Sequence, residues 1–192
     1  MKTRIDVLNH IVETKKVKRY LEIGVQLGVS IDGVKCDYKI GVDPAPLSVP
    51  TLNEFYKTTS DKYFEGAIEK GEKFDLVFID GLHEHKQVYR DIENAFQCLN
   101  KGGVIVCHDM LPDNLEYTKP TWCGDAYKAL IDLITQQPLV NITLIEDDHG
   151  CAILTKGRKK KEPVEFVSYD YEWYIKNKHL FNCMSFDQYV NE

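Results

Sequence analysis

Two stretches decide the fold of this 192-residue chain: YLEIGVQLGVS at residues 20–30 and IGVDP at residues 40–44. The first is a short apolar run that leads to Gly24 and Gly28, and the second is an apolar run that ends at Asp43. Nineteen positions separate Gly24 from Asp43, close to the roughly 20 expected in one strand–helix–strand unit. Glycines let backbone approach a ligand, and an acid ending the next strand accepts hydrogen bonds from ribose hydroxyls. The pattern predicts a nucleoside site at the edge of a parallel sheet, although the two glycines alone would also fit a simple tight turn.

The rest of the core reads as alternating strands and helices. Continuous apolar runs of strand length occupy residues 20–23, 38–42, 74–79 and 104–107. They do not alternate with polar residues, which is typical of strands covered on both faces. Apolar residues at helical spacing predict helices over about residues 3–14, over 87–99 with residues 100–103 as its end, and near 126–134. A further short strand is expected near residues 56–59, before a helix capped by Ser60 or Asp61. This order predicts the α/β class, with a Rossmann-like, doubly wound, mostly parallel sheet.

The last third of the chain changes character. Residues 111–120 form a long loop rich in Pro, Asp and Asn that suggests a functional lid, and residues 140–145 and 151–154 flank a turn and read as a hairpin. Residues 158–192 are unusually aromatic. They fit a strap over the sheet edge, a wall of the substrate pocket, or a subunit contact that would make the protein a homodimer. We expect a single domain over residues 1–192, with an N-terminal helix (1–17), a core (18–157) and this aromatic extension (158–192).

Composition excludes several classes of partner. The chain carries 30 acidic and 24 basic residues, a net charge of −6, so a nucleic-acid groove is not expected. Its one basic run, at residues 158–161, reads as a solvated loop. No stretch approaches the roughly 20 apolar residues of a membrane span. The six cysteines form no CxxC pair and several lie in apolar runs, which suggests reduced thiols and a cytoplasmic protein.

Polar side chains follow each of the predicted strands. Asp80 and His83 follow residues 74–79, and His108 and Asp109 follow residues 104–107. Because parallel strands end at one rim of a sheet, these groups are expected to converge. Asp80, His108 and Asp109 offer oxygen and imidazole ligands for a divalent ion such as Mg²⁺, and His83 is placed to remove a proton at neutral pH. The plainer alternatives are that the two aspartates cap helices and that His83 is structural.

Glu22 is unusual because it lies inside an apolar strand. An unpaired buried carboxylate costs several kcal/mol, so Glu22 needs partners such as backbone amides or the amine of a ligand.

Four segments together resemble class I S-adenosylmethionine-dependent methyltransferases. They are LEIGVQLGVS (21–30), IGVDP (40–44), FDLVFIDGLHEHKQVYRDIENAFQCLNKGGVIVCHD (74–109) and DHGCAILTKG (148–157). The resemblance is closest to the short family-24 type, akin to catechol and caffeoyl-CoA O-methyltransferases. It implies a seven-stranded sheet whose last strand runs antiparallel, in agreement with the predicted hairpin.

The resemblance also implies roles for individual residues. The cofactor would be held by Glu22, Gly24, Val25, Gly28, Ser30, Asp43, Ser60, Asp61 and Asp80, with the first five around its methionine part, Asp43 at the ribose, and Ser60 and Asp61 by the adenine. The ligands of the metal-using relatives correspond to Asp80, His108 and Asp109. Their catalytic lysine is replaced by His83, and their Asp-Asn pair is His-Asp in this chain, so a proton acceptor is kept while the metal ligands differ.

The expected function is O-methylation of a small hydroxylated acceptor, with a sugar or glycoside as the leading class and a divalent metal as an aid. Two other readings stay open on sequence alone. One is a cofactor-binding partner module without turnover. The other is a nicotinamide-dependent oxidoreductase, against which stand the absence of a GxGxxG spacing and of a substrate domain.

Overall fold

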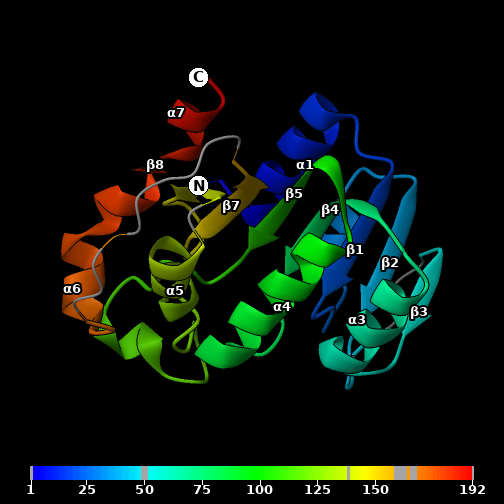
Figure 1. Ribbon diagram of the computed structural model, residues 1–192, viewed down its shortest axis with the longest axis horizontal. Helices are drawn as coiled ribbons and strands as arrows, with labels where there is room; N and C mark the ends of the chain where they lie inside the picture. Colours follow the sequence, from blue (N-terminus) through cyan, green and yellow to red (C-terminus); the bar gives the residue numbers. More distant parts are fainter. Residues whose placement is uncertain (1, 49–51, 138, 158–163, 165–167, 192) are drawn as a thin grey trace.

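The computed structural model describes residues 2–48, 52–137, 139–157, 164 and 168–191. They form one mixed sheet with helices on both faces (Figure 1). In chain order the strands are β1 (Arg19–Ile23), β2 (Tyr38–Val42), β3 (Glu54–Tyr56), β4 (Phe74–Ile79), β5 (Leu99–Cys107), β6 (Val140–Ile145), β7 (Cys151–Lys156) and β8 (Cys183–Met184). The helices are α1 (Arg4–Lys15), α2 (Val29–Gly33), α3 (Ser60–Glu69), α4 (His85–Gln97), α5 (Lys128–Gln136), α6 (Tyr171–Lys176) and α7 (Phe186–Tyr189), with 3₁₀ turns η1 (Leu115–Thr118) and η2 (Lys178–Phe181).

The sheet order is β3-β2-β1-β4-β5-β7-β6-β8, and only β7 runs antiparallel to its neighbours. The doubly wound, mostly parallel architecture and the antiparallel hairpin strand are therefore confirmed. The number of strands differs from the seven expected, because two residues of the C-terminal tail pair with β6 as β8. The chain order reverses between β1 and β4, and the ends of these strands meet at the crevice where α/β sheets bind ligands.

Three predicted boundaries were wrong. The short third strand lies at residues 54–56 rather than 56–59, and α3 is capped by Thr59, whose side chain accepts a hydrogen bond from the Lys62 N–H. The predicted stop at residues 100–103 is instead the beginning of β5, where the register with β4 shifts between Phe74 and Leu76. Gly102, at φ +83°, supplies the left-handed backbone of this irregularity.

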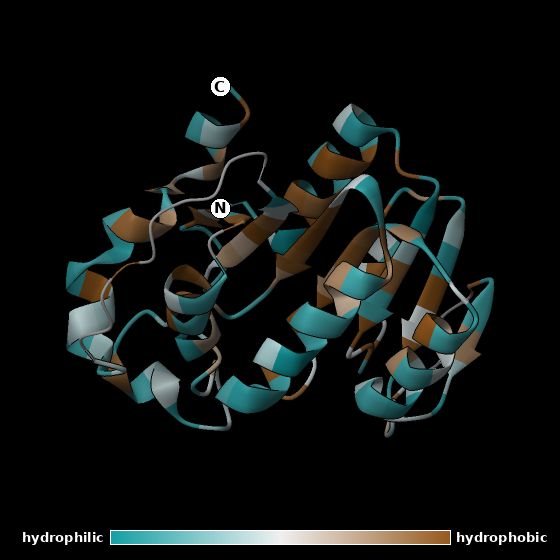
Figure 2. Ribbon diagram, viewed as in Figure 1, coloured by the Kyte–Doolittle hydropathy of each residue, from teal (hydrophilic) through white to brown (hydrophobic). Residues whose placement is uncertain are grey.

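Apolar side chains fill the space on both sides of the sheet. In Figure 2 the central strands are coloured as mostly hydrophobic. On one face Phe64 of α3, Ile92 of α4 and Leu130 of α5 pack against the strands. On the other, Leu8 of α1 and Ile31 of α2 cover them. Burial on both faces explains why β1, β4 and the end of β5 are mostly apolar instead of alternating with polar residues, with Glu22 and Asp75 as the exceptions inside β1 and β4. Among the described residues, no helix is both long enough and apolar enough to span a bilayer.

The described part of the aromatic tail packs against the sheet edge. Tyr174 and Phe181 are fully buried beside α5 and β6. The Tyr174 hydroxyl donates to the Met110 carbonyl at 2.6 Å, and the Tyr171 hydroxyl donates to the Pro112 carbonyl at 2.8 Å. The tail thus supports the start of the loop that follows β5. Phe166 and the basic run at residues 158–161 lie outside the described residues.

Candidate active site

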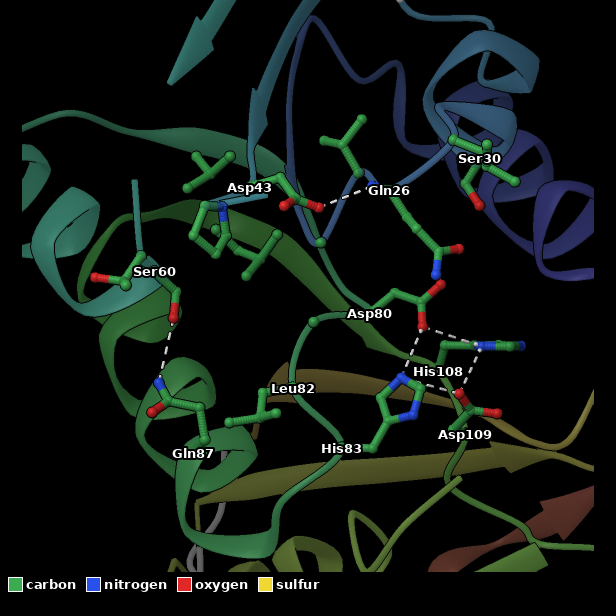
Figure 3. A pocket seen from close by; sticks show the side chains of 18 of the residues that line it. Gln26, Ser30, Asp43, Ser60, Asp80, Leu82, His83, Gln87, His108 and Asp109 are labelled. Carbon is green, nitrogen blue, oxygen red and sulfur yellow. Dashed lines mark hydrogen bonds and ion pairs between the residues drawn. The ribbon is translucent and has the colours of Figure 1, made fainter. Parts of the chain in front are cut away.

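A cavity of about 680 Å³ opens at the carboxyl ends of β1, β2, β4 and β5 (Figure 3). Ten of the twelve site residues predicted from sequence line it: Gly24, Val25, Ser30, Asp43, Ser60, Asp61, Asp80, His83, His108 and Asp109. Ser60 lies on one side of the pocket, and His83, His108 and Asp109 lie together on the other (Figure 3). The predicted convergence of strand-end groups at one rim is therefore observed.

Glu22 and Gly28 do not line the cavity. The Glu22 side chain points into the protein, where it accepts a hydrogen bond from the Tyr20 hydroxyl, and the residue is only 1% exposed. Burial raises the pKa of this carboxyl to about 8, against the opposing effect of the Tyr20 bond. Gly28 instead begins α2 with φ +80°. Glu22 therefore pairs inside the cavity wall and Gly28 shapes the backbone of that wall, and their contact with the cofactor stays a prediction.

The raised pKa of Glu22 predicts how the stability of the protein depends on pH. Between pH 4.5 and about 8 the folded state retains a proton that the unfolded state loses, so stability falls as pH rises through this window. The contribution is at most about 1.4 kcal/mol per pH unit. The free energy of unfolding can be measured with urea at pH 5 and at pH 8. We expect it to fall less between these two pH values for Glu22→Gln than for the wild type. Equal losses in the two proteins would show that Glu22 is ionised in the folded state.

The turn after β1 is held tightly against β2 and β4. The Gly24 N–H donates to the Val42 carbonyl at 2.9 Å, and Gly24 has φ +89°. The Gln26 N–H donates to Asp43 Oδ2 at 2.8 Å, and the Ala45 N–H donates to Asp43 Oδ1 at 2.7 Å. The buried Asp43 carboxylate thus ties the glycine turn to the end of β2 and faces the cavity (Figure 3).

Gly24 leaves no room for a side chain. A Cβ at this position would overlap the Asp80 carbonyl and lie 2.6 Å from the Gly81 Cα, in a backbone conformation that favours glycine. Gly24→Ala should therefore destabilise the protein by about 3 kcal/mol or more in urea unfolding. Gly66→Ala is the matched control, because a Cβ there has no neighbour within 4 Å among the described residues and Gly66 lies inside α3. It should stabilise by about 0.5–1 kcal/mol. A Gly24→Ala protein as stable as the wild type would refute the close approach.

Ser60 and Asp61 begin α3 at one side of the cavity. The Gln87 side-chain amide lies 3.2 Å from Ser60 Oγ and 3.0 Å from Asp61 Oδ1. Gln87 also lines the cavity and was not predicted. This side therefore offers hydroxyl, carboxylate and amide groups with hydrogen-bonding capacity.

A cluster of two histidines and three aspartates forms the other side. His108 Nδ1 lies 3.3 Å from Asp80 Oδ1 and 3.4 Å from Asp109 Oδ2. His108 Nε2 lies 3.5 Å from Asp148 Oδ2, on the β6–β7 turn. Burial alone would lower the pKa of His108, but the three carboxylates outweigh it and raise this pKa well above its ordinary value. Burial likewise acts to raise the pKa of Asp80, yet His108, His83 and Arg4 bring it down to about 2.

His83 joins the same cluster. Its Nδ1 lies 2.6 Å from the Trp122 carbonyl, which can only accept, so we assign the proton to Nδ1. Its Nε2 then faces Asp109 Oδ2 at 3.2 Å and Asp80 Oδ1 at 3.6 Å (Figure 3). Burial lowers the pKa of His83, but bonds and charges from the two aspartates and the Trp122 carbonyl raise it on balance.

The cluster contains the donor types that a divalent cation needs. Asp80, His83 and Asp109 each offer one ligand atom, and these atoms lie within 4.8 Å of one another. The predicted ligand His108 touches the same two aspartates from the other side. Two carboxylate oxygens with an imidazole nitrogen suit a hard or borderline divalent ion.

Arg4 and Asp148 belong to this region and were not predicted. Arg4 comes from α1 and lines the cavity, and Asp148 contacts both Arg4 and His108. Arg4 lies on a helix, so the strand-end pattern carries no signal for it. Asp148 does follow a strand of the common direction, β6, but its segment was interpreted from sequence only as the turn of a hairpin.

Comparison with known proteins agrees with the fold of the sheet. A family model for a methyltransferase domain matches residues 41–110. No curated protein matches the chain. A Staphylococcus aureus protein assigned as a caffeoyl-CoA O-methyltransferase superposes with a TM-score of 0.63 at 17% identity, covering 82% of this chain and 85% of its own. The S-adenosylhomocysteine-bound methyltransferase PaMTH1 of Podospora anserina gives 0.61 at 17% identity, covering 81% and 80%.

A third solved structure is larger than this chain. MycE, a methyltransferase of the mycinamycin biosynthetic pathway, was solved with Mg, S-adenosylhomocysteine and mycinamycin VI. It gives a TM-score of 0.54 at 23% identity, over 84% of this chain and 50% of its own. Likeness at this level of identity establishes the fold, and the family match covers the segment from β2 to the end of β5. The chain therefore has the fold of these methyltransferases, and its residues 41–110 match the methyltransferase-domain model.

Proposed function

We propose that the protein transfers a methyl group from S-adenosylmethionine to a hydroxyl of a small acceptor, with a sugar or glycoside as the leading class. The observation that carries the proposal is one continuous cavity. Gly24 and Asp43 line this cavity, and so does the cluster of His83, Asp80 and Asp109. The proposed cofactor site and the proposed proton acceptor would therefore adjoin.

The cavity fits the cofactor. A volume of about 680 Å³ suits a ligand of this size, and its polar groups lie at separate places along the wall. Asp43 accepts two main-chain N–H groups and keeps lone pairs for the ribose hydroxyls. The turn from Gly24 to Ser30 would hold the methionine part, with Asp80 beside it. Ser60 and Asp61 would adjoin the adenine.

His83 is the proposed base. S-adenosylmethionine supplies a methyl group already activated on a sulfonium. The protein must therefore align the acceptor oxygen, remove its proton and exclude water. The Trp122 carbonyl fixes the Nδ1 side of the His83 ring, so that Nε2 faces the cavity cluster. Because, against the effect of burial, Asp80 and Asp109 raise the pKa of His83, Nε2 can take the hydroxyl proton only after losing its own proton, and methyl transfer should increase as the pH rises through that pKa.

Asp80, His108 and Asp109 are the proposed ligands of a divalent ion, which would orient the acceptor hydroxyl and lower its pKa. The two carboxylates support this, although the ligand atoms that lie within 4.8 Å of one another are those of Asp80, His83 and Asp109. His108 lies 3.3 Å and 3.4 Å from the same two aspartates and would have to release its proton to bind the ion. If the ion is required, a chelator should abolish methyl transfer and Mg²⁺ should restore it. Turnover unchanged by the chelator would remove the metal from the proposal and leave His83 as the base.

The loop from residue 111 to 122 is the proposed cover of the acceptor. Its Trp122 is 50% exposed and stacks on Tyr117, with ring centroids 4.7 Å apart. Half-exposed aromatic faces next to polar groups suit an acceptor with both apolar and hydroxylated surfaces, such as a sugar ring on an aglycone. The tail hydroxyls of Tyr171 and Tyr174 hold the beginning of this loop. A homodimer stays a prediction.

A methyl-transfer assay with isotope-labelled cofactor against a panel of sugars, glycosides and phenols tests the function. We expect label in a hydroxylated acceptor and S-adenosylhomocysteine as the second product. Binding of the cofactor with no transfer to any acceptor would favour a partner module without turnover. Binding of NAD in place of S-adenosylmethionine would favour an oxidoreductase.

A further inference from the structure

Arg4 is the only lysine or arginine among the described residues that line the cavity. It begins α1, and the fold brings it beside α2, where its Nε donates to Ser30 Oγ at 2.8 Å. Its main-chain N–H donates to Asp148 Oδ2 at 2.8 Å, and its Nη1 lies 3.2 Å from the same oxygen. These contacts fix the guanidinium at the end of the cavity next to the glycine turn, with 28% of the side chain exposed.

A negative group stands directly beside this positive one. Arg4 Nε lies 3.7 Å from Asp80 Oδ2, so the wall presents one cation and one anion side by side. An α-amino acid carries the complementary pair, a carboxylate and an ammonium. Ser60 and Gln87 lie on the opposite side of the pocket from Ser30 (Figure 3), and Arg4 contacts Ser30. The Arg4 end is therefore left for the amino-acid part of an adenosyl cofactor.

The Arg4 guanidinium has N–H groups that remain available to a ligand. Arginine carries five N–H groups in a rigid fork, and the described contacts of Arg4 involve Nε and Nη1. Within the described part of the chain no hydrogen bond is formed by Nη2. Because Ser30 and Asp148 already hold the side chain in place, little conformational freedom is lost when a carboxylate binds to the remaining donors.

We propose that Arg4, oriented by Ser30 and Asp148, binds the α-carboxylate of the cofactor's amino-acid part. The inference rests on the proposed function, because it presupposes an S-adenosylmethionine site. It assigns to the N-terminal helix a direct part in cofactor recognition and makes the site selective for adenosyl ligands that keep their carboxylate.

Isothermal titration of the full chain with two ligands tests the assignment. One ligand is S-adenosylhomocysteine, and the other is its decarboxylated analogue, which keeps the adenosine, the thioether and the amine. Arg4→Ala should weaken S-adenosylhomocysteine binding about 10- to 100-fold, the range of a charge-assisted hydrogen-bonded contact, and change analogue binding less than about 2-fold. Arg4→Lys keeps a positive charge but loses the planar set of guanidinium N–H groups. Its affinity for S-adenosylhomocysteine should lie between those of the wild type and Arg4→Ala. Arg19→Ala removes a remote ion pair with Glu72 and should change neither affinity.

The outcomes separate the possible roles. If Arg4→Ala weakens the binding of both ligands equally, Arg4 only shapes the wall of the cavity and the assignment is overturned. If Arg4→Ala and Arg4→Lys both bind S-adenosylhomocysteine like the wild type, Arg4 does not contact the carboxylate. If the folded wild type binds neither ligand while Arg4 variants melt normally, the proposed function itself fails, and this inference fails with it.

Discussion

Replacing His83 with alanine should lower kcat for methyl transfer by about 10²- to 10⁴-fold, the usual contribution of a positioned general base. The His83 Nε2 faces the acids of the cavity, and the Trp122 carbonyl holds the other ring nitrogen in place. No other described histidine occupies this position, since His108 is enclosed by Asp80, Asp109 and Asp148. Affinity for S-adenosylhomocysteine should stay within about 2-fold, because Asp80 is the one proposed cofactor residue that His83 contacts and Arg4 and His108 also hold it.

His179→Ala is the matched control for this experiment, because His179 is exposed and lies on the C-terminal tail away from the cavity wall. It should leave kcat unchanged. Full activity of His83→Ala on an identified acceptor would remove His83 from the mechanism. Loss of activity together with loss of cofactor binding would instead indicate that the substitution damages the cavity.

Replacing Asp43 with asparagine should weaken binding of S-adenosylhomocysteine by about 100-fold or more. Two charge-assisted hydrogen bonds to ribose hydroxyls are worth about 1.5–3 kcal/mol each, and every 1.4 kcal/mol is a tenfold change. The amide also accepts less well from the N–H groups of Gln26 and Ala45, so the glycine turn is held less firmly. Isothermal titration at constant ionic strength measures the effect.

Asp37→Asn makes the same chemical change at an exposed position just before β2 and should bind like the wild type. Circular dichroism of both variants separates weakened binding from unfolding. Unchanged affinity of Asp43→Asn would show that this carboxylate serves only to hold the turn, and the ribose would then bind elsewhere.

The sequence predicted the parts of the fold that depend on local pattern. β2 and β4 occupy the predicted residues, because strands buried on both faces are continuous apolar runs bounded by polar ends. The strand-end residues Asp43, Asp80 and Asp109 were found for a related reason. Once strands are parallel, their carboxyl ends meet at one rim wherever they lie in the chain.

The features that were missed depend on contacts between distant segments. Arg4 meets Ser30 and Asp148 only after α1 and the β6–β7 turn dock on the same end of the sheet. Glu22 looked available to a ligand, but alternation along β1 turns its side chain toward Tyr20 and away from the cavity. The two-residue β8 is too short to show any periodicity, and it exists because the tail packs along β6. Local sequence patterns therefore could not predict these contacts.

Titration of the folded protein with S-adenosylhomocysteine, with NAD as the competitor, tests the central claim most directly. The cavity at the ends of β1, β2 and β4 predicts one binding site per chain, displaced by S-adenosylmethionine and not by NAD. Absence of binding by a protein that unfolds cooperatively, or displacement by NAD, would contradict the account.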